Sequence, residues 1–332
     1  MTTSAIPPVF ELDGTLQRPD LPLETRMPHV AILMCTYNGE RFLTEQLNSF
    51  ERQTHRNWTL VVSDDSSQDG TLKILQAYSS SWGAGCLKVV LGPQRGFVTN
   101  FLSLTARTDI HADFYAWSDQ DDIWCEDKLQ TALAWLQTIP KHTPALYCGR
   151  TELICESGIT VGYSPRFCLP PHFSNALVQN IGGGNTMVFN QAARDLLQEA
   201  GDSLIVPSHD WWAYQLISGA GGAIHYDPEP KVLYRQHDGN LVGSNSNWFA
   251  RFKRLRMVFQ GRFYEWNAQN IHALEAMHHR LSQEHQAILA HFKAARNQKP
   301  LQRFLGIRRA GLYRQTLFGN LGLILATLLK KI

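Results

Sequence analysis

The chain has 332 residues, of which 44% are hydrophobic, so it can bury one sizeable core and carry a helical appendix. Its net charge of +2 hides a split, because residues 1–250 carry 16 basic and 26 acidic side chains, whereas residues 251–332 carry 15 basic and 3 acidic ones. The six cysteines have neither C-x-x-C nor zinc-ligand spacing. This argues against a cysteine-based zinc site and indicates reduced thiols, as in a cytosolic protein.

Residues 1–27 lack the basic start and the apolar stretch of a signal peptide, so we predict a flexible N-terminal arm. Within it, residues 10–16 (FELDGTL) are similar to the signature of haloacid-dehalogenase-type phosphatases. However, Glu11 stands at the position of that family's nucleophilic aspartate. The motif also follows Pro7 and Pro8, which cannot belong to a central strand because proline donates no ladder hydrogen bond. We therefore set the phosphatase interpretation aside.

Four apolar segments predict strands of one sheet, at residues 29–36, 58–62, 87–91 and 114–117. Helical patterns follow the first two, and polar residues gather where each strand ends. In an open, largely parallel α/β sheet, the strand ends and the helix N-termini converge at the edge where ligands bind. We therefore expect an α/β fold with a mostly parallel central sheet flanked by helices, and a site at that edge.

The last of these strands runs into Ser118–Trp124 (SDQDDIW), which places three carboxylates within four positions: Asp119, Asp121 and Asp122. Charges packed so closely repel one another unless a cation lies among them, and hard oxygen ligands favour Mg²⁺ or Mn²⁺. A divalent cation in turn suggests a diphosphate ligand. The alternative is a solvated acidic turn.

Five segments in this order resemble the inverting family 2 glycosyltransferases of the GT-A fold, in their rhamnosyltransferase-like branch: TYNG at 36–39, SDDSSQDGT at 63–71, SDQDDIW at 118–124, SHDWW at 208–212 and YRQH at 234–237. The resemblance implies a GT-A catalytic domain, which we place at residues 28–245, before a helical region at 246–332. It further implies metal-dependent transfer of L-rhamnose from dTDP-L-rhamnose to a lipid-linked O-antigen or other surface polysaccharide intermediate. A UDP-hexose is the alternative donor.

The residues expected at the donor are Thr36, Tyr37, Asn38, Asp65, Arg95, Asp119 and Arg235. The ring of Tyr37 can stack on a nucleobase, and ordinary core packing is its alternative role. The resemblance implies that the Asp65 carboxylate accepts the N3–H of uracil or thymine. Arg95 is either a donor contact or a solvated loop charge, and Arg235 is a charge partner for Asp210 or for the diphosphate.

The resemblance also places Asp119 near the ribose and the metal, and Asp121 directly on the ion that bridges the two phosphates. That ion acts as a Lewis acid on the leaving diphosphate, and Asp122 supports it. His237 is a further candidate ligand for the metal or a phosphate, with a purely structural role as the alternative.

Inverting transfer needs a general base that takes the proton of the acceptor hydroxyl, and Asp210 is the candidate. Two adjacent tryptophans should desolvate its carboxylate and raise its pKa; a simple helix N-cap is the alternative. Glycines before residue 187 allow the backbone to approach a ligand closely. The expected acceptor side consists of Gly183, Gly184, Asn185, Trp211 and Trp212.

The basic C-terminal region predicts helices, one amphipathic at residues 252–263 and one apolar at residues 317–329. The apolar stretch has 13 residues, fewer than the roughly 20 needed to span a bilayer. Basic and apolar residues together favour an anionic membrane surface over nucleic acid. We expect a cytoplasmic protein, peripheral on the inner face of the bacterial cytoplasmic membrane. Alternatively, these helices pack on the catalytic domain or on a twin subunit in a homodimer.

Two other classes remain in view. A nucleotidyltransferase also joins a doubly wound sheet to Mg²⁺, but it would need a basic glycine-rich loop after the first strand, and residues 36–40 are not one. A non-enzymatic glycan-binding protein at the membrane is the second. Metal-dependent hydrolysis of a sugar nucleotide would separate both from a glycosyltransferase.

Overall fold

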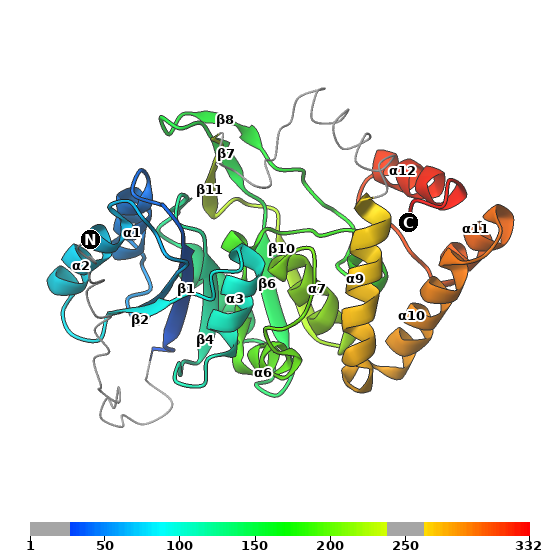
Figure 1. The fold of residues 1–332 in the computed structure, drawn as a ribbon, viewed down its shortest axis with the longest axis horizontal. Coiled ribbons are helices and arrows are strands. Elements are labelled where there is room, and N and C mark those ends of the chain that lie inside the picture. Colours follow the sequence, from blue (N-terminus) through cyan, green and yellow to red (C-terminus); the bar gives the residue numbers. More distant parts are fainter. Residues whose placement is uncertain (1–26, 238–261) are drawn as a thin grey trace, which may run out of the picture.

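The computed structural model describes residues 27–237 and 262–332, which Figure 1 shows as a central sheet with helices around it. The sheet has seven strands in the order β10-β6-β9-β4-β1-β2-β3. β9 runs antiparallel to β4 and β6, and every other pair is parallel. This confirms the predicted α/β fold with a mostly parallel sheet. The strands are β1 (Val30–Thr36), β2 (Trp58–Asp64), β3 (Leu87–Leu91), β4 (Phe114–Ser118), β6 (Ala145–Gly149), β9 (Val188–Asn190) and β10 (Ala223–Asp227).

The sheet is covered on both faces, because alternate side chains of β1 enter two different cores. Val30, Ile32 and Met34 pack with residues of α1 (Leu43–Glu51), α2 (Thr71–Trp82) and α4 (Lys128–Leu136). Ala31, Leu33 and Cys35 pack with residues of α3 (Phe97–Ala106), α6 (Gln191–Ala200) and α7 (His209–Gly219). Fully buried strands of this kind read as continuous apolar runs in the sequence, which is why they were predictable.

A second, smaller sheet has the strand order β5-β11-β7-β8. Its strands are β5 (Ile123–Trp124), β7 (Glu152–Ile154), β8 (Thr160–Tyr163) and β11 (Val232–Arg235). β5 and β7 directly follow β4 and β6 in the chain, so this sheet lies at the carboxyl edge of the central one (Figure 1). The edge at which we predicted the site is therefore bordered by both sheets.

The first of the C-terminal helices lies beside α7 in Figure 1, and the others lie beyond it. The C-terminal helices are α9 (Arg262–Ala276), α10 (Gln283–Arg296), α11 (Pro300–Arg309) and α12 (Leu317–Leu328), with a 3₁₀ turn, η2 (His278–Arg280). Leu274, Leu289 and Phe292 are buried in the same core as α7. The side chain of Gln315 accepts a hydrogen bond from Leu169 N–H at 3.0 Å and donates one to the Leu169 carbonyl at 3.0 Å. The helical region is thus continuous with the α/β region.

Helix α12 packs by one face only. Leu323, Ala326 and Thr327 are buried. Four further apolar side chains of α12 are only partly covered, with 40–52% of each exposed: Leu321, Ile324, Leu325 and Leu328. The predicted arm at residues 1–26 and most of the predicted helix at 252–263 lie outside the described residues.

Candidate active site

The acidic segment connects β4 to β5, so its side chains leave the central sheet at the carboxyl edge. Asp122 is fully buried; its carboxylate accepts hydrogen bonds from the side-chain amide of Asn185 at 2.6 Å and from Arg235 N–H at 3.3 Å. Burial and the two neighbouring aspartates raise the pKa of Asp122. This residue therefore fastens the acidic segment to two other parts of the chain.

The other two aspartates lie close to residues far away in the sequence. Nε2 of His237 is 2.7 Å from a carboxylate oxygen of Asp121, and both side chains are mostly buried. Burial, then the charge of Asp121, then that of Asp210 raise the pKa of Asp119 to about 7. The predicted metal ligands and the predicted base therefore share one neighbourhood.

A divalent cation fits this donor set chemically, because carboxylates that repel one another gain from a positive charge among them. The ligand atoms do not converge on their own. His172, Glu284 and His285 are the one set of three in the described residues whose ligand atoms all lie within 4.8 Å of one another. A cation at the acidic segment would therefore also need oxygen atoms of a bound diphosphate, as Mg²⁺ commonly does.

Lys128, which the sequence analysis missed, accompanies the acidic segment. Its side chain is fully buried, and its ammonium nitrogen lies 3.2 Å from the centre of the Trp124 ring. In the part of the chain that the structure describes, this nitrogen has no hydrogen-bond partner. Burial lowers the pKa of Lys128, and the charges of Asp122 and Asp119 oppose that shift. A lysine in the first turn of an ordinary helix gives no sign of this position in the sequence.

The ends of β1 and β2 are tied together. Thr36 donates a hydrogen bond to the Asp64 carboxylate at 2.7 Å, and Asn38 N–H donates to the Ser67 hydroxyl at 2.9 Å. Asn38 has a φ of +49°, which asparagine tolerates better than most residues. Tyr37 is 59% exposed, so its alternative role in core packing is wrong.

Asp65 organises the loop that follows β3. Its carboxylate accepts hydrogen bonds from Gln94 N–H at 2.6 Å and Gly96 N–H at 3.2 Å. The side chain of Arg95, between these two residues, is exposed. Asp65 and Arg95 therefore stand at the same edge as Tyr37, at the ends of neighbouring strands.

Arg235 does not pair with Asp210, which was one of its two predicted partners. Its ion pair is with Glu45 at 2.7 Å, and its Nε donates to the Asp121 carbonyl at 3.0 Å. The side chain is 1% exposed and also lies over the Phe42 ring. Arg235 therefore supports the acidic segment from inside the protein.

Asp210 lies in the first turn of α7, two residues after the N-cap Ser208, whose side chain makes no capping hydrogen bond. One carboxylate oxygen accepts from Trp211 N–H at 2.6 Å and the other from Gly184 N–H at 3.2 Å. Two backbone donors thus fix the orientation of this carboxylate.

The glycines before Asn185 serve packing within the protein. A Cβ on Gly182 would lie 2.7 Å from that of Cys148, and a Cβ on Gly184 would lie 2.3 Å from Nε2 of His209. The expectation that Gly184 makes room for a ligand is corrected accordingly, whereas Gly183 is exposed. The 3₁₀ turn η1 (Gly184–Thr186) connects Asp210, through Gly184, to the acidic segment, through Asn185.

The predicted acceptor contacts of two tryptophans are also corrected. Trp211 is 6% exposed and donates its indole N–H to the Ala176 carbonyl at 2.6 Å, and Trp212 is fully buried. Both side chains anchor α7 in the core.

His209, which precedes Asp210 in the chain, is buried beside the candidate site. Its ring is 4% exposed, stacks on Phe101 at 4.0 Å and contacts the Trp117 ring edge-on at 4.8 Å. Burial lowers its pKa to about 4, so the ring is neutral at pH 7. The neutral ring packs against Gly184, whose N–H donates a hydrogen bond to Asp210.

The family model "Glycosyl transferase family 2" matches residues 31–183. The dTDP-rhamnosyl transferase RfbG of Shigella flexneri is 28% identical over 239 residues, which cover 68% of this chain and 78% of that protein. The UDP-Glc:alpha-D-GlcNAc-diphosphoundecaprenol beta-1,3-glucosyltransferase WfgD of Escherichia coli is 30% identical over 157 residues, which cover 47% of this chain and 57% of that protein. Residues 31–183 therefore match a family 2 glycosyltransferase domain, and the chain is a glycosyltransferase.

Solved structures agree on the fold. The crystal structure of Staphylococcus aureus TarS 1–349 in complex with UDP-GlcNAc aligns with a TM-score of 0.50 and 17% identity, over 86% of this chain and 93% of that one. The protein has the GT-A fold, as predicted. The expectation of a glycosyltransferase is confirmed over a nucleotidyltransferase and a non-enzymatic glycan-binding protein.

Proposed function

We propose that the protein transfers a sugar from a nucleoside diphosphate to a glycan acceptor with inversion, and that Mg²⁺ or Mn²⁺ binds at the diphosphate. One observation carries the proposal. Gly184 N–H donates to the Asp210 carboxylate and the adjacent Asn185 side chain donates to Asp122, so one short turn joins the base candidate to the acidic segment at the same edge of the sheet. Inverting displacement needs a base on the acceptor side and positive charge at the leaving group.

In this reaction Asp210 takes the proton of the acceptor hydroxyl while the acceptor oxygen bonds to the anomeric carbon. The bond from that carbon to the diphosphate breaks, and the diphosphate leaves with the bonding electrons. Gly184 N–H and Trp211 N–H hold the base in orientation for this step. When bound by Asp119, Asp121 and His237, the cation supplies positive charge for the leaving diphosphate.

Tyr37 and Asp65 are the groups proposed to receive the nucleobase. The exposed ring of Tyr37 offers a stacking face, and the Asp65 carboxylate can accept the N3–H of thymine or uracil. The likeness to a dTDP-rhamnosyl transferase supports dTDP-L-rhamnose as the donor. The likeness to a UDP-glucose enzyme keeps a UDP-hexose as the second candidate.

The acceptor is proposed to be a lipid-linked saccharide that the protein meets at an anionic membrane surface, on the inner face of the cytoplasmic membrane. Seven large apolar side chains of the α12 region are 40–81% exposed: Leu317, Phe318, Leu321, Ile324, Leu325, Leu328 and Leu329. At 100° per residue they occupy about 140° of the helix circumference. Lys330 and Lys331 follow, and the helix carries no acidic residue.

This surface favours a helix lying in the plane of the interface, where apolar side chains enter the lipid and basic ones meet its charge. In residues 27–237 and 262–332, no helix has the length and apolar character to cross a membrane. A twin subunit fits this face less well, because a symmetric contact would bring two basic regions together.

A donor panel tests the proposal. Thermal stabilisation of the protein by dTDP-L-rhamnose, UDP-glucose and UDP-GlcNAc, each with and without Mn²⁺, should single out one donor and show metal dependence. Turnover of that donor with a lipid-linked acceptor should give a product of inverted anomeric configuration. Retention of configuration would overturn the assignment of Asp210.

A further inference from the structure

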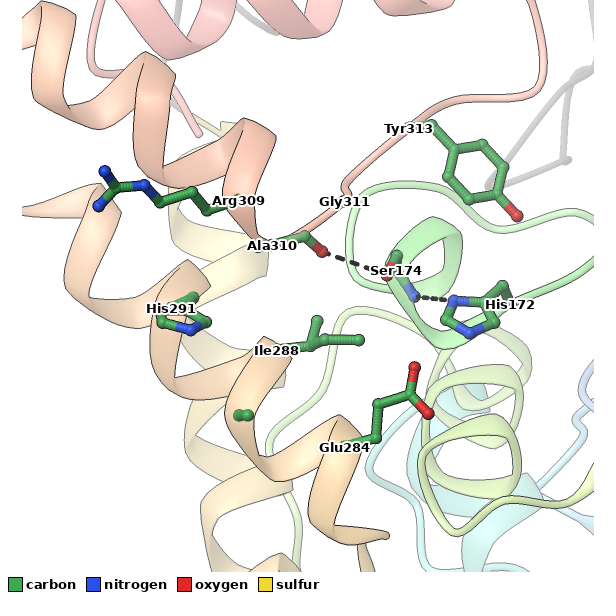
Figure 2. Close-up of a pocket in the computed structure, with 10 residues that line it drawn as sticks. His172, Ser174, Glu284, Ile288, His291, Arg309, Ala310, Gly311 and Tyr313 are labelled. Carbon is green, nitrogen blue, oxygen red and sulfur yellow. Dashed lines mark hydrogen bonds between the residues drawn. The ribbon is translucent and has the colours of Figure 1, made fainter.

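A second group of metal-binding side chains lies away from the active site, between the α/β region and the C-terminal helices. Figure 2 shows a hollow of ≈ 460 Å³ between the start of α5 (Phe173–Ala176), the exposed side of α10 and the end of α11. Its lining includes His172, Glu284, Ile288, His291 and Arg309. None of these residues belongs to the acidic segment or to the first turn of α7.

Three side chains that can bind a metal lie close together at the edge of this hollow. One ligand atom from each of His172, Glu284 and His285 lies within 4.8 Å of the others. In Figure 2 the Glu284 carboxylate and the His172 ring face the same space. The three come from two regions of the chain, because His172 precedes α5, whereas Glu284 and His285 lie in the first turn of α10.

His285 is oriented as metal-binding histidines usually are. Its Nδ1 lies 2.9 Å from the Gly219 carbonyl, at the end of α7. That bond places the proton on Nδ1 and leaves the lone pair on Nε2. A ring nitrogen that donates to a backbone carbonyl, with the other nitrogen free for an ion, is the common arrangement behind metal ligands.

His172 has the opposite constraint. Its Nδ1 accepts a hydrogen bond from Ser174 N–H at 3.1 Å and so caps α5. An ion at this ring takes the lone pair from that cap, which is the weaker of the two interactions. Burial, and the nearby His285, lower the pKa of His172, which favours the neutral form that a metal needs.

We propose that His172, Glu284 and His285 bind a zinc ion that ties α10 to α5. Two imidazoles and one carboxylate are a common donor set for Zn²⁺, whereas Mg²⁺ and Ca²⁺ prefer oxygen ligands alone. Around a tetrahedral zinc ion, ligand atoms lie about 3.4 Å apart. The three must therefore draw together, and the exposed side chain of Glu284 is free to move. The hollow leaves a fourth position open to water.

The proposed ion would brace the part of the α/β region that holds the base helix. The Tyr214 hydroxyl, on α7, accepts a hydrogen bond from His172 N–H at 3.0 Å and donates one to the His172 carbonyl at 3.2 Å. Zinc on His172 and His285 would therefore join two segments that both contact α7.

The test is titration of the tag-free, full-length protein with Zn²⁺ in excess Mg²⁺, followed by calorimetry and thermal melting. We expect one zinc ion per chain at this site and a rise in melting temperature. His172→Asn, which keeps a capping side chain, Glu284→Gln and His285→Gln should each weaken this binding at least tenfold. His291→Gln, in the same hollow but outside the set, should leave it unchanged.

A further variant distinguishes zinc bound at the proposed site from zinc bound at the acidic segment. Asp121→Ala should retain the zinc that His285→Gln loses. Equal zinc binding by the wild type and the three ligand variants, or no stoichiometric zinc binding by the wild type, would overturn the proposal.

Discussion

The α/β region and the C-terminal helices depart from the usual distribution of side chains in opposite ways. The first buries charge, since Asp122, Lys128 and Arg235 are each no more than 1% exposed. The second exposes apolar surface, with Phe318 of α12 81% exposed. Buried charges are costly unless they are paired, and large exposed apolar faces usually mark a contact surface. Each departure therefore points to a function, the first to chemistry and the second to attachment.

The largest expected effect concerns the base. Asp210→Asn keeps the shape and one acceptor oxygen but cannot take a proton. We expect donor binding to survive while transfer falls by roughly 10² to 10⁴, the usual loss of a general base. Steady-state transfer assays and donor titration measure the two separately. Near wild-type transfer would mean that another group is the base.

A smaller loss is expected at the turn that links the base to the acidic segment. Gly184→Ala places a Cβ 2.3 Å from Nε2 of His209, so the turn must move and the Gly184 hydrogen bond to Asp210 weakens. We expect kcat to fall about 10²-fold, as small displacements in an active site do. Adding His209→Ala, which makes room, should recover part of that rate; no recovery would show that the contact with His209 is not the cause.

The buried ring of His209 predicts a pH dependence of stability. Burial lowers its pKa from 6.5 to about 4, so between these values the unfolded chain binds a proton that the folded chain does not. The stability that comes from keeping His209 neutral is fully present above pH 6.5. It is lost as the pH falls toward 4, and the free energy of unfolding then decreases by up to about 3 kcal/mol. Urea unfolding at pH 7 and pH 4.5 should show a smaller difference for His209→Leu than for the wild type. An equal difference would contradict the neutral, buried state.

Substitutions on the exposed face of α12 should have the smallest effect on stability. They should instead have a large effect on attachment of the protein to membranes. Leu325→Ser should change the free energy of unfolding by less than about 0.5 kcal/mol, because Leu325 is 43% exposed, and it should weaken flotation with anionic liposomes. Leu323→Ala is the matched control at a 4% exposed position, where about 2–5 kcal/mol should be lost. If the full-length protein stays with the soluble fraction at low salt, the proposed attachment to an anionic membrane is wrong.

Local sequence was enough for four of the seven strands of the central sheet, β1 to β4, and for the acidic segment, because long apolar runs and clustered carboxylates are visible in a short window. It also placed Asp210 at the start of a helix, where the structure has it. The partner of Arg235 was not predictable, since Glu45 lies 190 positions away. Nor was the burial of Trp211 and Trp212, because one apolar helix face looks like another until the neighbouring helices are placed. The glycine turn was recognised, but which side chains fill its space depends on the packing of α7.

The most direct test of the central claim is donor affinity with and without Mn²⁺ in the wild type and in Asp121→Ala. We expect Mn²⁺ to tighten binding of the nucleoside diphosphate sugar to the wild type. Asp121→Ala should lose this gain in donor affinity together with turnover. Equal donor affinity of the wild type with and without the metal would contradict this expectation.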